Sequence, residues 1–354
     1  MELRFTSRNP ARICRAACLA LSLVFLSCFQ IACTCVNKNA DPLVSAAIAQ
    51  AKSDLKPLES PASAALTRDQ RKYFQYYRIQ MVREPKLGSF SSGDLLLAGQ
   101  FHRPSRFDSG KGTVVVVHGY FDHAGTAANL INRLVEEGYH VAVYDHPGHG
   151  LSEGRHVSVR DFETYSVAFS DFLGMVSEHL PGPYDVVAHS MGSTVVIDHL
   201  NMGECSSIRK MVFLTPLIRD MKPKSLHTLG AIISPFSDYL GRIREDNTTN
   251  QEYLEFSARD PLQYACVSTR WSVAFNRWRR EARDFGPRSE APLVIYAGSD
   301  AVVNNEVGQA WMKRAFPSHR NRVIEGGRHQ LLNDPLPIRG KVLDLICREL
   351  DADE

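Results

Sequence analysis

The chain lacks an excess of either charge and has few cysteines in its main part, and each shortage excludes a class of protein. Its 354 residues include 41 Lys or Arg against 39 Asp or Glu, so no basic surface for binding nucleic acid is indicated. Only three of the eight cysteines, Cys205, Cys266 and Cys347, follow residue 35. Three scattered cysteines form neither a disulfide framework nor the spacing of a zinc site. We therefore expect buried free thiols, with one disulfide as the alternative if the chain is exported.

Long apolar runs are also missing, with one exception near the N-terminus. Residues 16–33 are almost wholly apolar, and four arginines precede them. This pattern predicts a signal peptide or signal anchor over residues 1–35, with the N-terminus on the cytoplasmic side and a membrane surface as the partner of the segment. Cys28 and Cys33 follow small residues, so lipoprotein processing is the alternative to plain export or a membrane tether. The protein is expected to be exported, and periplasmic or membrane-tethered.

The remainder divides into a linker and one domain. Residues 36–70 hold few large apolar side chains, which predicts a flexible tether that is helical in part near 43–52. The folded domain is expected over 71–354, where apolar strand-like runs alternate with helical patterns. Such alternation predicts an α/β fold with a mostly parallel sheet and helices on both faces. The strands are expected at 74–82, 94–102, 113–117, 139–144, 184–188, 210–214, 292–297 and 322–325.

The alternation breaks between residues 216 and 288. A structureless loop of that length is improbable in a compact domain, so we predict a helical cap over the carboxyl edge of the sheet. Trp271, Phe275 and Trp278 recur at helical spacing. Two interpretations stay open for this helix, packing of its aromatic face against the domain or contact with acyl chains or anionic headgroups, and packing is preferred.

One serine lies in the setting of an activated nucleophile. The sequence Ala-His-Ser-Met-Gly, residues 188–192, joins the strand at 184–188 to a helical run, and this strand–turn–helix context is typical of a nucleophile elbow at Ser190. Asp300 and His329 each follow a later strand, in the order acid then histidine. The spacing predicts a triad in which Asp300 orients His329, and His329 removes the proton from Ser190.

An oxyanion also needs backbone donors. One is expected from the amide of Met191, at the start of the helix after Ser190, where the helix dipole adds to it. The other is expected from the amide of Tyr120, in the loop after the strand at 113–117. In that loop His118 is predicted to be structural. His146 and His149 resemble a metal pair only superficially, because Pro147 and Gly148 turn the chain between them. No metal and no cofactor are expected.

Taken in order, these motifs resemble those of the serine α/β-hydrolases, in the branch of monoacylglycerol lipases and bacterial lysophospholipases. The resemblance covers about residues 75–350 and rests on His-Gly-Tyr (118–120), Tyr-Asp-His-Pro-Gly-His-Gly-Leu-Ser (144–152), Ala-His-Ser-Met-Gly (188–192), Gly-Ser-Asp (298–300) and Gly-Arg-His (327–329). It implies an α/β-hydrolase fold with a cap and cleavage of carboxylic esters through an acyl-enzyme, with lysophospholipid or monoacylglycerol as substrate. Arg-Asp-Pro-Leu (259–262) also resembles the cap of the lysophospholipases.

Two alternatives remain. An exported aminopeptidase of the proline-iminopeptidase type needs an acidic group in the cap to hold the substrate amine, and the candidates are Glu245, Asp246, Glu252 and Glu255. A non-catalytic binding protein of this fold is disfavoured by the intact Ser190, Asp300 and His329 set. The sequence gives no indication of the oligomeric state.

Overall fold

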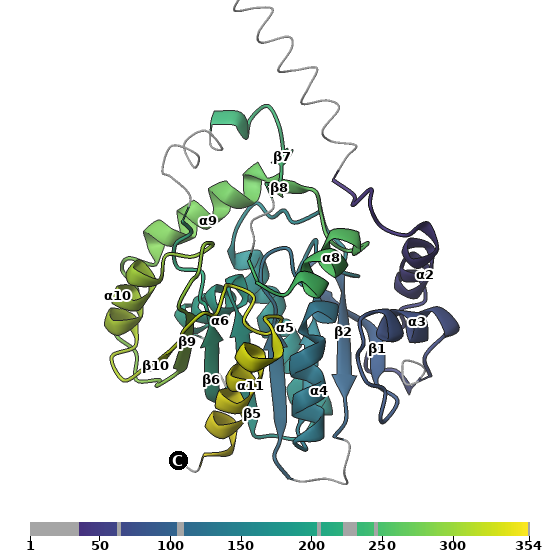
Figure 1. Cartoon of the computed structure of the whole chain (residues 1–354), viewed down its shortest axis with the longest axis horizontal. Coiled ribbons are helices and arrows are strands. Elements are labelled where there is room, and N and C mark those ends of the chain that lie inside the picture. Colours follow the sequence, from purple (N-terminus) through teal and green to yellow (C-terminus); the bar gives the residue numbers. More distant parts are fainter. Residues whose placement is uncertain are drawn as a thin grey trace, which may run out of the picture.

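Eight strands form one central sheet, and helices pack around it (Figure 1). The computed structural model describes residues 35–61, 65–104, 110–203, 207–221, 232–243 and 247–352. The strand order is β1-β2-β4-β3-β5-β6-β9-β10, with β2 antiparallel to both neighbours and every other pair parallel. The strands are β1 (Lys86–Ser92), β2 (Leu95–His102), β3 (Thr113–Val117), β4 (His140–Tyr144), β5 (Tyr184–His189), β6 (Ile208–Leu214), β9 (Leu293–Ala297) and β10 (Arg320–Ile324).

Helices cover both faces of this sheet, as predicted. Side chains alternate along a strand, so Val115 and Val117 of β3 enter one apolar cluster while Val114 and Val116 enter another. The first cluster includes residues of α5 (Glu163–His179), α6 (Met191–Asn201) and α10 (Asn305–Ala315). The second includes residues of α2 (Pro42–Ser53), α3 (Arg68–Tyr76), α4 (Ala128–Glu136, preceded by the 3-10 turn η2, Ala124–Ala127) and α11 (Leu336–Asp351).

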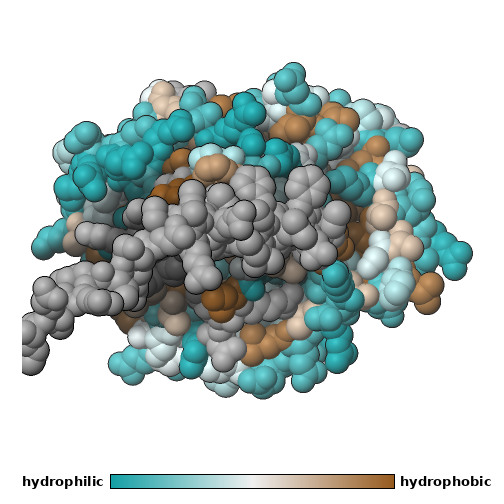
Figure 2. Space-filling model, turned by 90° about the horizontal axis from the view of Figure 1, so that it is seen from above, coloured by the Kyte–Doolittle hydropathy of each residue, from teal (hydrophilic) through white to brown (hydrophobic). Residues whose placement is uncertain are grey.

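The insertion after β6 forms a cap at the carboxyl edge of the sheet, as predicted, but it is not wholly helical. It contains α8 (Gln251–Arg259) and α9 (Thr269–Glu281) together with a small antiparallel pair, β7 (Tyr239–Gly241) and β8 (Cys266–Ser268). In Figure 1, α9 lies on the side of α10 and α8 on the side of α4. Seen from above, the surface is mostly hydrophilic, with separate apolar patches between hydrophilic regions (Figure 2).

The strand predicted at 74–82 is wrong. Residues 68–76 form α3, which begins at a capping box in which Thr67 accepts from the amide of Gln70 and the Gln70 side chain accepts from that of Thr67. Tyr73 and Phe74 are buried on this helix. The first strand is instead β1, which lies between two of the predicted strands, and it pairs along its whole length with β2.

The flexible tether predicted for 36–70 is also wrong, although the helix expected inside it is present as α2. Ile48 and Ala51 of α2 are buried in the core, and Leu58 is fully buried. Asn37 donates hydrogen bonds to the carbonyl oxygens of Ala258 (3.0 Å) and Asp260 (2.9 Å) in the cap region. The folded domain therefore begins at or before Cys35, because a few scattered apolar residues are enough to pack this segment against the core.

A disulfide joins the segment before α2 to the cap. Cys35 is bonded to Cys266 on β8, and Val36 makes a β-bridge with Tyr264. The expectation of a free thiol at Cys266 is therefore wrong, because its partner is a cysteine that the sequence pattern groups with the N-terminal segment. Cys347 is a buried free thiol, as expected, whereas Cys205 lies outside the described residues. Within the described ranges no helix is long and apolar enough to cross a membrane, and these ranges do not include residues 16–33.

Candidate active site

Ser190 stands on a strained turn between β5 and α6. Its backbone has φ 52° and ψ −117°, a conformation that L-residues rarely adopt, and its amide donates to the carbonyl oxygen of Leu214 on β6 (2.9 Å). The turn needs a small residue at Gly192, because a Cβ there would lie 2.3 Å from the carbonyl oxygen of Val117. Ser193 adds its own support by donating to the carbonyl of Ala188 (2.8 Å). The predicted strand–turn–helix context of Ser190 is present.

The structure brings Asp300 and His329 to Ser190. His329 Nε2 lies 3.0 Å from Ser190 Oγ, and His329 Nδ1 lies 2.9 Å from Asp300 Oδ2. Since a carboxylate only accepts, Nδ1 carries the ring proton and Nε2 is left to accept from the serine hydroxyl. Ser190 and His329 are each about 5% exposed. The arrangement can remove a proton from Ser190 and hold it on a histidine beside a carboxylate.

Asp300 is fixed by the backbone that follows it. Its Oδ1 accepts from the amides of Val302 (2.8 Å) and Val303 (2.9 Å), which leaves Oδ2 aimed at His329. Burial alone would raise the pKa of Asp300, but the histidine and these two amides hold it below its usual value. The side chain is therefore ionised at neutral pH.

The loop after β3 lies against the elbow. A Cβ on Gly119 would lie 3.1 Å from Ser190 Cβ, so a side chain there would crowd the elbow. Tyr120 lines the same cavity as Ser190, and Met191 is the first residue of α6. His118 is structural, as predicted. Its Nδ1 donates to the carbonyl of Gly119 (2.8 Å) and its Nε2 accepts from the amide of His146 (3.0 Å). Burial lowers the pKa of His118 well below its usual value, so the ring is neutral.

A second histidine beside the elbow holds three parts of the site together. His189 Nδ1 lies 3.1 Å from Asp122 Oδ2, and its Nε2 lies 3.0 Å from the carbonyl oxygen of His329. Both partners offer oxygen acceptors, so the ring of His189 bridges the side chain of Asp122 and the backbone of His329. Burial would raise the pKa of Asp122, but His189 and Gln330 hold it low. This buried pair links the loop after β3, the elbow and the backbone of the triad histidine.

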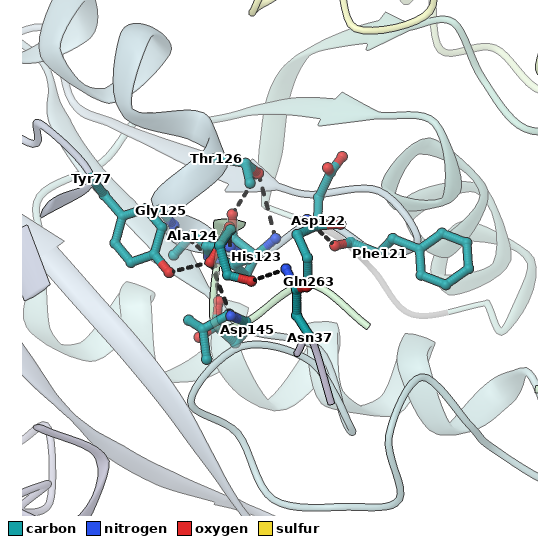
Figure 3. Close-up of polar contacts among 12 residues, drawn as sticks. Asn37, Tyr77, Phe121, Asp122, His123, Ala124, Gly125, Thr126, Asp145 and Gln263 are labelled. Carbon is teal, nitrogen blue, oxygen red and sulfur yellow. Dashed lines mark hydrogen bonds and ion pairs between the residues drawn. The ribbon is translucent and has the colours of Figure 1, made fainter. Parts of the chain in front are cut away.

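The cap is bonded to the same loop (Figure 3). Gln263 donates to the carbonyl of Phe121 (2.7 Å). Fully buried Asp260 accepts from His123 Nε2 (2.9 Å) and from the hydroxyl of Tyr77 (2.7 Å), so it joins the cap, the loop and the end of α3. These bonds fix the position of the backbone that includes Tyr120.

Between the cap and the sheet lies a cavity of about 590 Å³, within the range of small-molecule sites. Ser190 and His329 open into it. Much of its lining is apolar and comes from the region after β6, from β8 and α9, and from the loop after β9: Leu217, Met221, Val267, Trp271, Phe275 and Val302.

The aromatic face of α9 packs against the domain, which confirms the preferred interpretation. Trp271 stacks on Tyr120 with ring centroids 3.8 Å apart, and the indole of Trp278 donates to Asp198 (2.8 Å). Trp271 and Phe275 also line the cavity, so packing and ligand contact are combined on one face.

Of the four acidic residues considered for a peptidase, the two that the structure describes, Glu252 and Glu255, do not line the cavity. Glu252 bonds to Arg78 at the exposed surface, and Glu255 is exposed and outside the cavity lining. Glu245 and Asp246 lie outside the described residues.

Sequence reasoning missed Asp122, His189 and Asp260 as parts of the site. His189 is adjacent to Ser190, and Asp260 stands in the Arg-Asp-Pro-Leu stretch that resembles a lysophospholipase cap. The sequence could not indicate their partners, because Asp122 lies 67 residues from His189 and His123 lies 137 residues from Asp260.

The chain is similar in sequence to a known protein family and to proteins of known activity. Residues 108–336 match the family described as serine aminopeptidase, S33. Monoglyceride lipase of Rattus norvegicus is 26% identical over 249 residues, which cover 66% of this chain and 80% of that protein. Phospholipase YtpA of Bacillus subtilis (strain 168) is 24% identical over 238 residues, 63% of this chain and 89% of its own.

A solved structure of a soluble variant of the Saccharomyces cerevisiae monoglyceride lipase, in complex with a substrate analogue, has a similar fold. The TM-score is 0.66 at 17% identity, and the match covers 77% of this chain and 98% of that one. At that identity the likeness shows the fold alone, an α/β-hydrolase fold.

Proposed function

This chain belongs to the serine aminopeptidase S33 family of α/β-hydrolases, and from that premise we propose that it cleaves the carboxylic ester of a monoacyl lipid through an acyl-enzyme on Ser190. One observation supports the nucleophile above all others. Ser190 Oγ lies 3.0 Å from His329 Nε2, while His329 Nδ1 is held 2.9 Å from Asp300, at the wall of a cavity with a largely apolar lining.

The reaction follows from these positions. His329 takes the hydroxyl proton as Ser190 Oγ attacks the ester carbonyl carbon, and the carbonyl oxygen becomes an oxyanion. The amides of Tyr120 and Met191 donate to that oxygen. His329 then gives its proton to the alcohol oxygen as the ester bond breaks, leaving an acyl group on Ser190. A water molecule, deprotonated by His329, attacks the acyl-enzyme, and the fatty acid leaves while Ser190 regains its proton.

The substrate class is supported by the cavity and by the relatives. The apolar lining suits an acyl chain, and relatives covering most of their own length are named as a monoglyceride lipase and a phospholipase. We therefore propose monoacylglycerol or lysophospholipid as substrate.

The test is fatty-acid release by the full chain in detergent micelles, from monoacylglycerol and lysophospholipids with the same acyl chain. Ser190→Ala should abolish release, because only the attacking oxygen is lost. Ser272→Ala is the matched control, because Ser272 also lines the cavity but its hydroxyl donates to the carbonyl of Ser268, the residue before α9. Ser272→Ala should keep release, and release that persists in Ser190→Ala would contradict the proposal.

We also propose that the chain is exported and held at a membrane through its N-terminal segment. The Cys35–Cys266 disulfide supports export, since such bonds persist mainly in oxidising compartments. Lipoprotein processing at either Cys28 or Cys33 would leave Cys35 in the mature chain. Mass spectrometry of unreduced protein from the membrane and periplasmic fractions should find the peptides of residues 35 and 266 linked. Protein found in the cytoplasm with both thiols free would contradict export.

A further inference from the structure

The side chain of Tyr120, whose amide is the proposed oxyanion donor, is held by the cap. Its hydroxyl donates to the carbonyl of Val157 (2.7 Å) and accepts from the amide of Ser268, the last residue of β8 (3.3 Å). Its ring stacks on Trp271 with the centroids 3.8 Å apart. Because the ring and the amide belong to one residue, contacts that fix the ring also restrict where the amide points.

The cap backbone that leads to β8 bonds the same loop at two more points. We call residues 258–268 the cap segment. Within it, Gln263 donates to the carbonyl of Phe121 (2.7 Å), and Asp260 accepts from His123 Nε2 (2.9 Å). Three bonds from the cap segment therefore hold the loop of the oxyanion donor.

The cap segment has little regular structure to stiffen it. Residues 260–265 lie between the end of α8 and the start of β8. The strand β8 has three residues and pairs with β7, which also has three. Two-stranded pairs are only marginally stable in water. A further support is needed to keep the cap segment at a defined distance from the loop.

The first described residues of the chain, 35–37, supply that support, and we call them the N-terminal arm. Cys35 is disulfide-bonded to Cys266, and its carbonyl accepts from the amide of Ala265 (2.9 Å). The next residue of the arm makes an antiparallel β-bridge with Tyr264. Both cysteines are buried. The arm therefore lies along the cap segment as an additional short strand that is fixed by a covalent bond.

Asn37 bonds the other end of the cap segment. Its side-chain amide donates to the carbonyl oxygens of Ala258 (3.0 Å) and Asp260 (2.9 Å), and its oxygen accepts from the amide of Asn39 (3.2 Å). The side chain is buried and uses both its donors and its acceptor. Figure 3 shows Asn37 in one group of polar side chains with His123 and the other loop residues. The arm thus spans the cap segment from residue 258 to residue 266.

We propose that the N-terminal arm positions the oxyanion donor: through the cap segment it holds the amide of Tyr120, so that turnover at Ser190 depends on the Cys35–Cys266 disulfide. This inference rests on the proposed function, because it concerns the transition state of the ester cleavage proposed there. The arm residues lie outside the cavity lining, so they are positioning residues and not catalytic ones. A misplacement of about 1 Å in a catalytic group can cost about 100-fold in rate.

The disulfide makes this positioning dependent on oxidation. A dithiol reductant supplies two electrons and two protons, converts the bond into thiols at Cys35 and Cys266, and is itself oxidised to a disulfide. The arm then keeps only its hydrogen bonds to the cap segment. We therefore expect full turnover in an oxidising compartment and a lower rate in a reducing one.

The first test measures kcat and KM of the full chain on a chromogenic ester in neutral detergent micelles, before reduction by dithiothreitol, after it, and after reoxidation. Both acylation and deacylation pass through an oxyanion, so kcat reports its stabilisation whichever step is slower. Alkylation and mass spectrometry count the thiols. The double variant Cys35→Ser/Cys266→Ser removes the bond without a reductant. Cys347→Ser is its control, since Cys347 is a buried free thiol on α11.

The second test leaves the disulfide intact. Asn37→Ala removes the two bonds to the cap segment, and Asn39→Ala is the matched control, because Asn39 is exposed two residues away. Each variant is assayed below its own melting temperature. This variant and the reduced wild type keep the test decisive if the double cysteine variant does not fold.

Two ligands separate loss of positioning from general loosening of the cavity. A trifluoromethyl ketone accepts Ser190 Oγ at its carbonyl carbon, the serine proton passes to His329, and the resulting oxyanion faces the amide of Tyr120. The corresponding carbinol occupies the cavity but forms no oxyanion. A change in position of the donor weakens the ketone and leaves the carbinol unaffected.

The expected result is a fall in kcat of about 10- to 100-fold in the reduced wild type and in the double cysteine variant, less than complete loss of an oxyanion donor costs. KM should change little, the affinity for the ketone should fall in parallel with kcat, and reoxidation should restore the wild type. Asn37→Ala should show a smaller fall of the same kind, whereas Cys347→Ser and Asn39→Ala should behave as wild type.

An unchanged kcat after the disulfide is lost would overturn the inference. Equal weakening of the ketone and the carbinol would also overturn it, since the arm would then support the whole cavity and not the oxyanion donor. A wild type that cleaves no ester would instead overturn the proposed function, so the two failures are distinguishable.

Discussion

Replacing Asp300 by Asn tests the triad through a single atom. In the wild type, Asp300 Oδ1 accepts from the amides of Val302 and Val303, and Oδ2 faces His329 Nδ1 at 2.9 Å. An asparagine keeps the two backbone bonds only if its oxygen takes the place of Oδ1. Its NH₂ group then faces His329 Nδ1, which must become an acceptor. The ring proton therefore moves to Nε2, where it faces Ser190 and prevents proton abstraction.

The size of the effect follows from this change of tautomer. The same substitution in a well-studied serine protease costs about 10⁴-fold in kcat. We expect a fall of about 10³- to 10⁴-fold here, equivalent to about 4–5.5 kcal/mol of transition-state stabilisation. Stability should change little, because the backbone bonds of residue 300 are kept and the surroundings are not repacked.

The assay is kcat/KM on a chromogenic short-chain ester, together with the rate of fluorophosphonate labelling and the melting temperature. Glu325→Gln is the matched control, since Glu325 is an exposed carboxylate in the loop that precedes His329. Asp300→Asn activity within tenfold of wild type, with the melting temperature unchanged, would refute the role of Asp300 in holding the tautomer.

Three further predictions concern stability. Replacing both Cys35 and Cys266 by Ser should lower the free energy of unfolding by about 3–5 kcal/mol, measured by denaturant titration, since the disulfide closes a very long loop; an unchanged value would mean that the bond adds nothing. Gly192→Ala should destabilise by about 1–3 kcal/mol and lose activity, because its Cβ would meet the Val117 carbonyl at 2.3 Å; a variant with normal melting and turnover contradicts this. Burial raises the pKa of Asp198, so its folded-state pKa lies above the unfolded one and stability is lost as pH rises through it. Asp198→Asn should therefore gain melting temperature relative to wild type as the pH rises from the ordinary aspartate pKa through the raised one, and a relative loss over that range would count against the sign.

The sheet and the predicted positions of the triad residues could be read from local patterns. The run of five residues in β3 is β-branched throughout and buried, and β5, β9 and β10 are each followed by a short turn or loop that contains a predicted site residue. Such signals are local, because a buried parallel strand is continuous in its apolar character and a nucleophile elbow is a contiguous motif. Because β5, β6, β9 and β10 are adjacent and parallel, their carboxyl ends lie at one edge of the sheet, and Ser190, Asp300 and His329 meet there.

The features that were missed depend on contacts between distant residues. The disulfide pairs Cys35 with a cysteine 231 residues away, and no spacing rule could select that partner. The last residues of α3 were included in the strand predicted at 74–82 because aromatic residues favour strands, whereas Tyr73 and Phe74 are buried on a helix.

The most direct test of the central claim is to trap the acyl-enzyme and locate it. The full chain would be mixed with a slowly deacylated long-chain ester, quenched in acid within the first turnover, digested and analysed by mass spectrometry. The account predicts an acyl group on the peptide of residue 190, absent in Ser190→Ala and present in Ser272→Ala. Turnover with no adduct at Ser190, or an adduct on another residue that persists in Ser190→Ala, would contradict it.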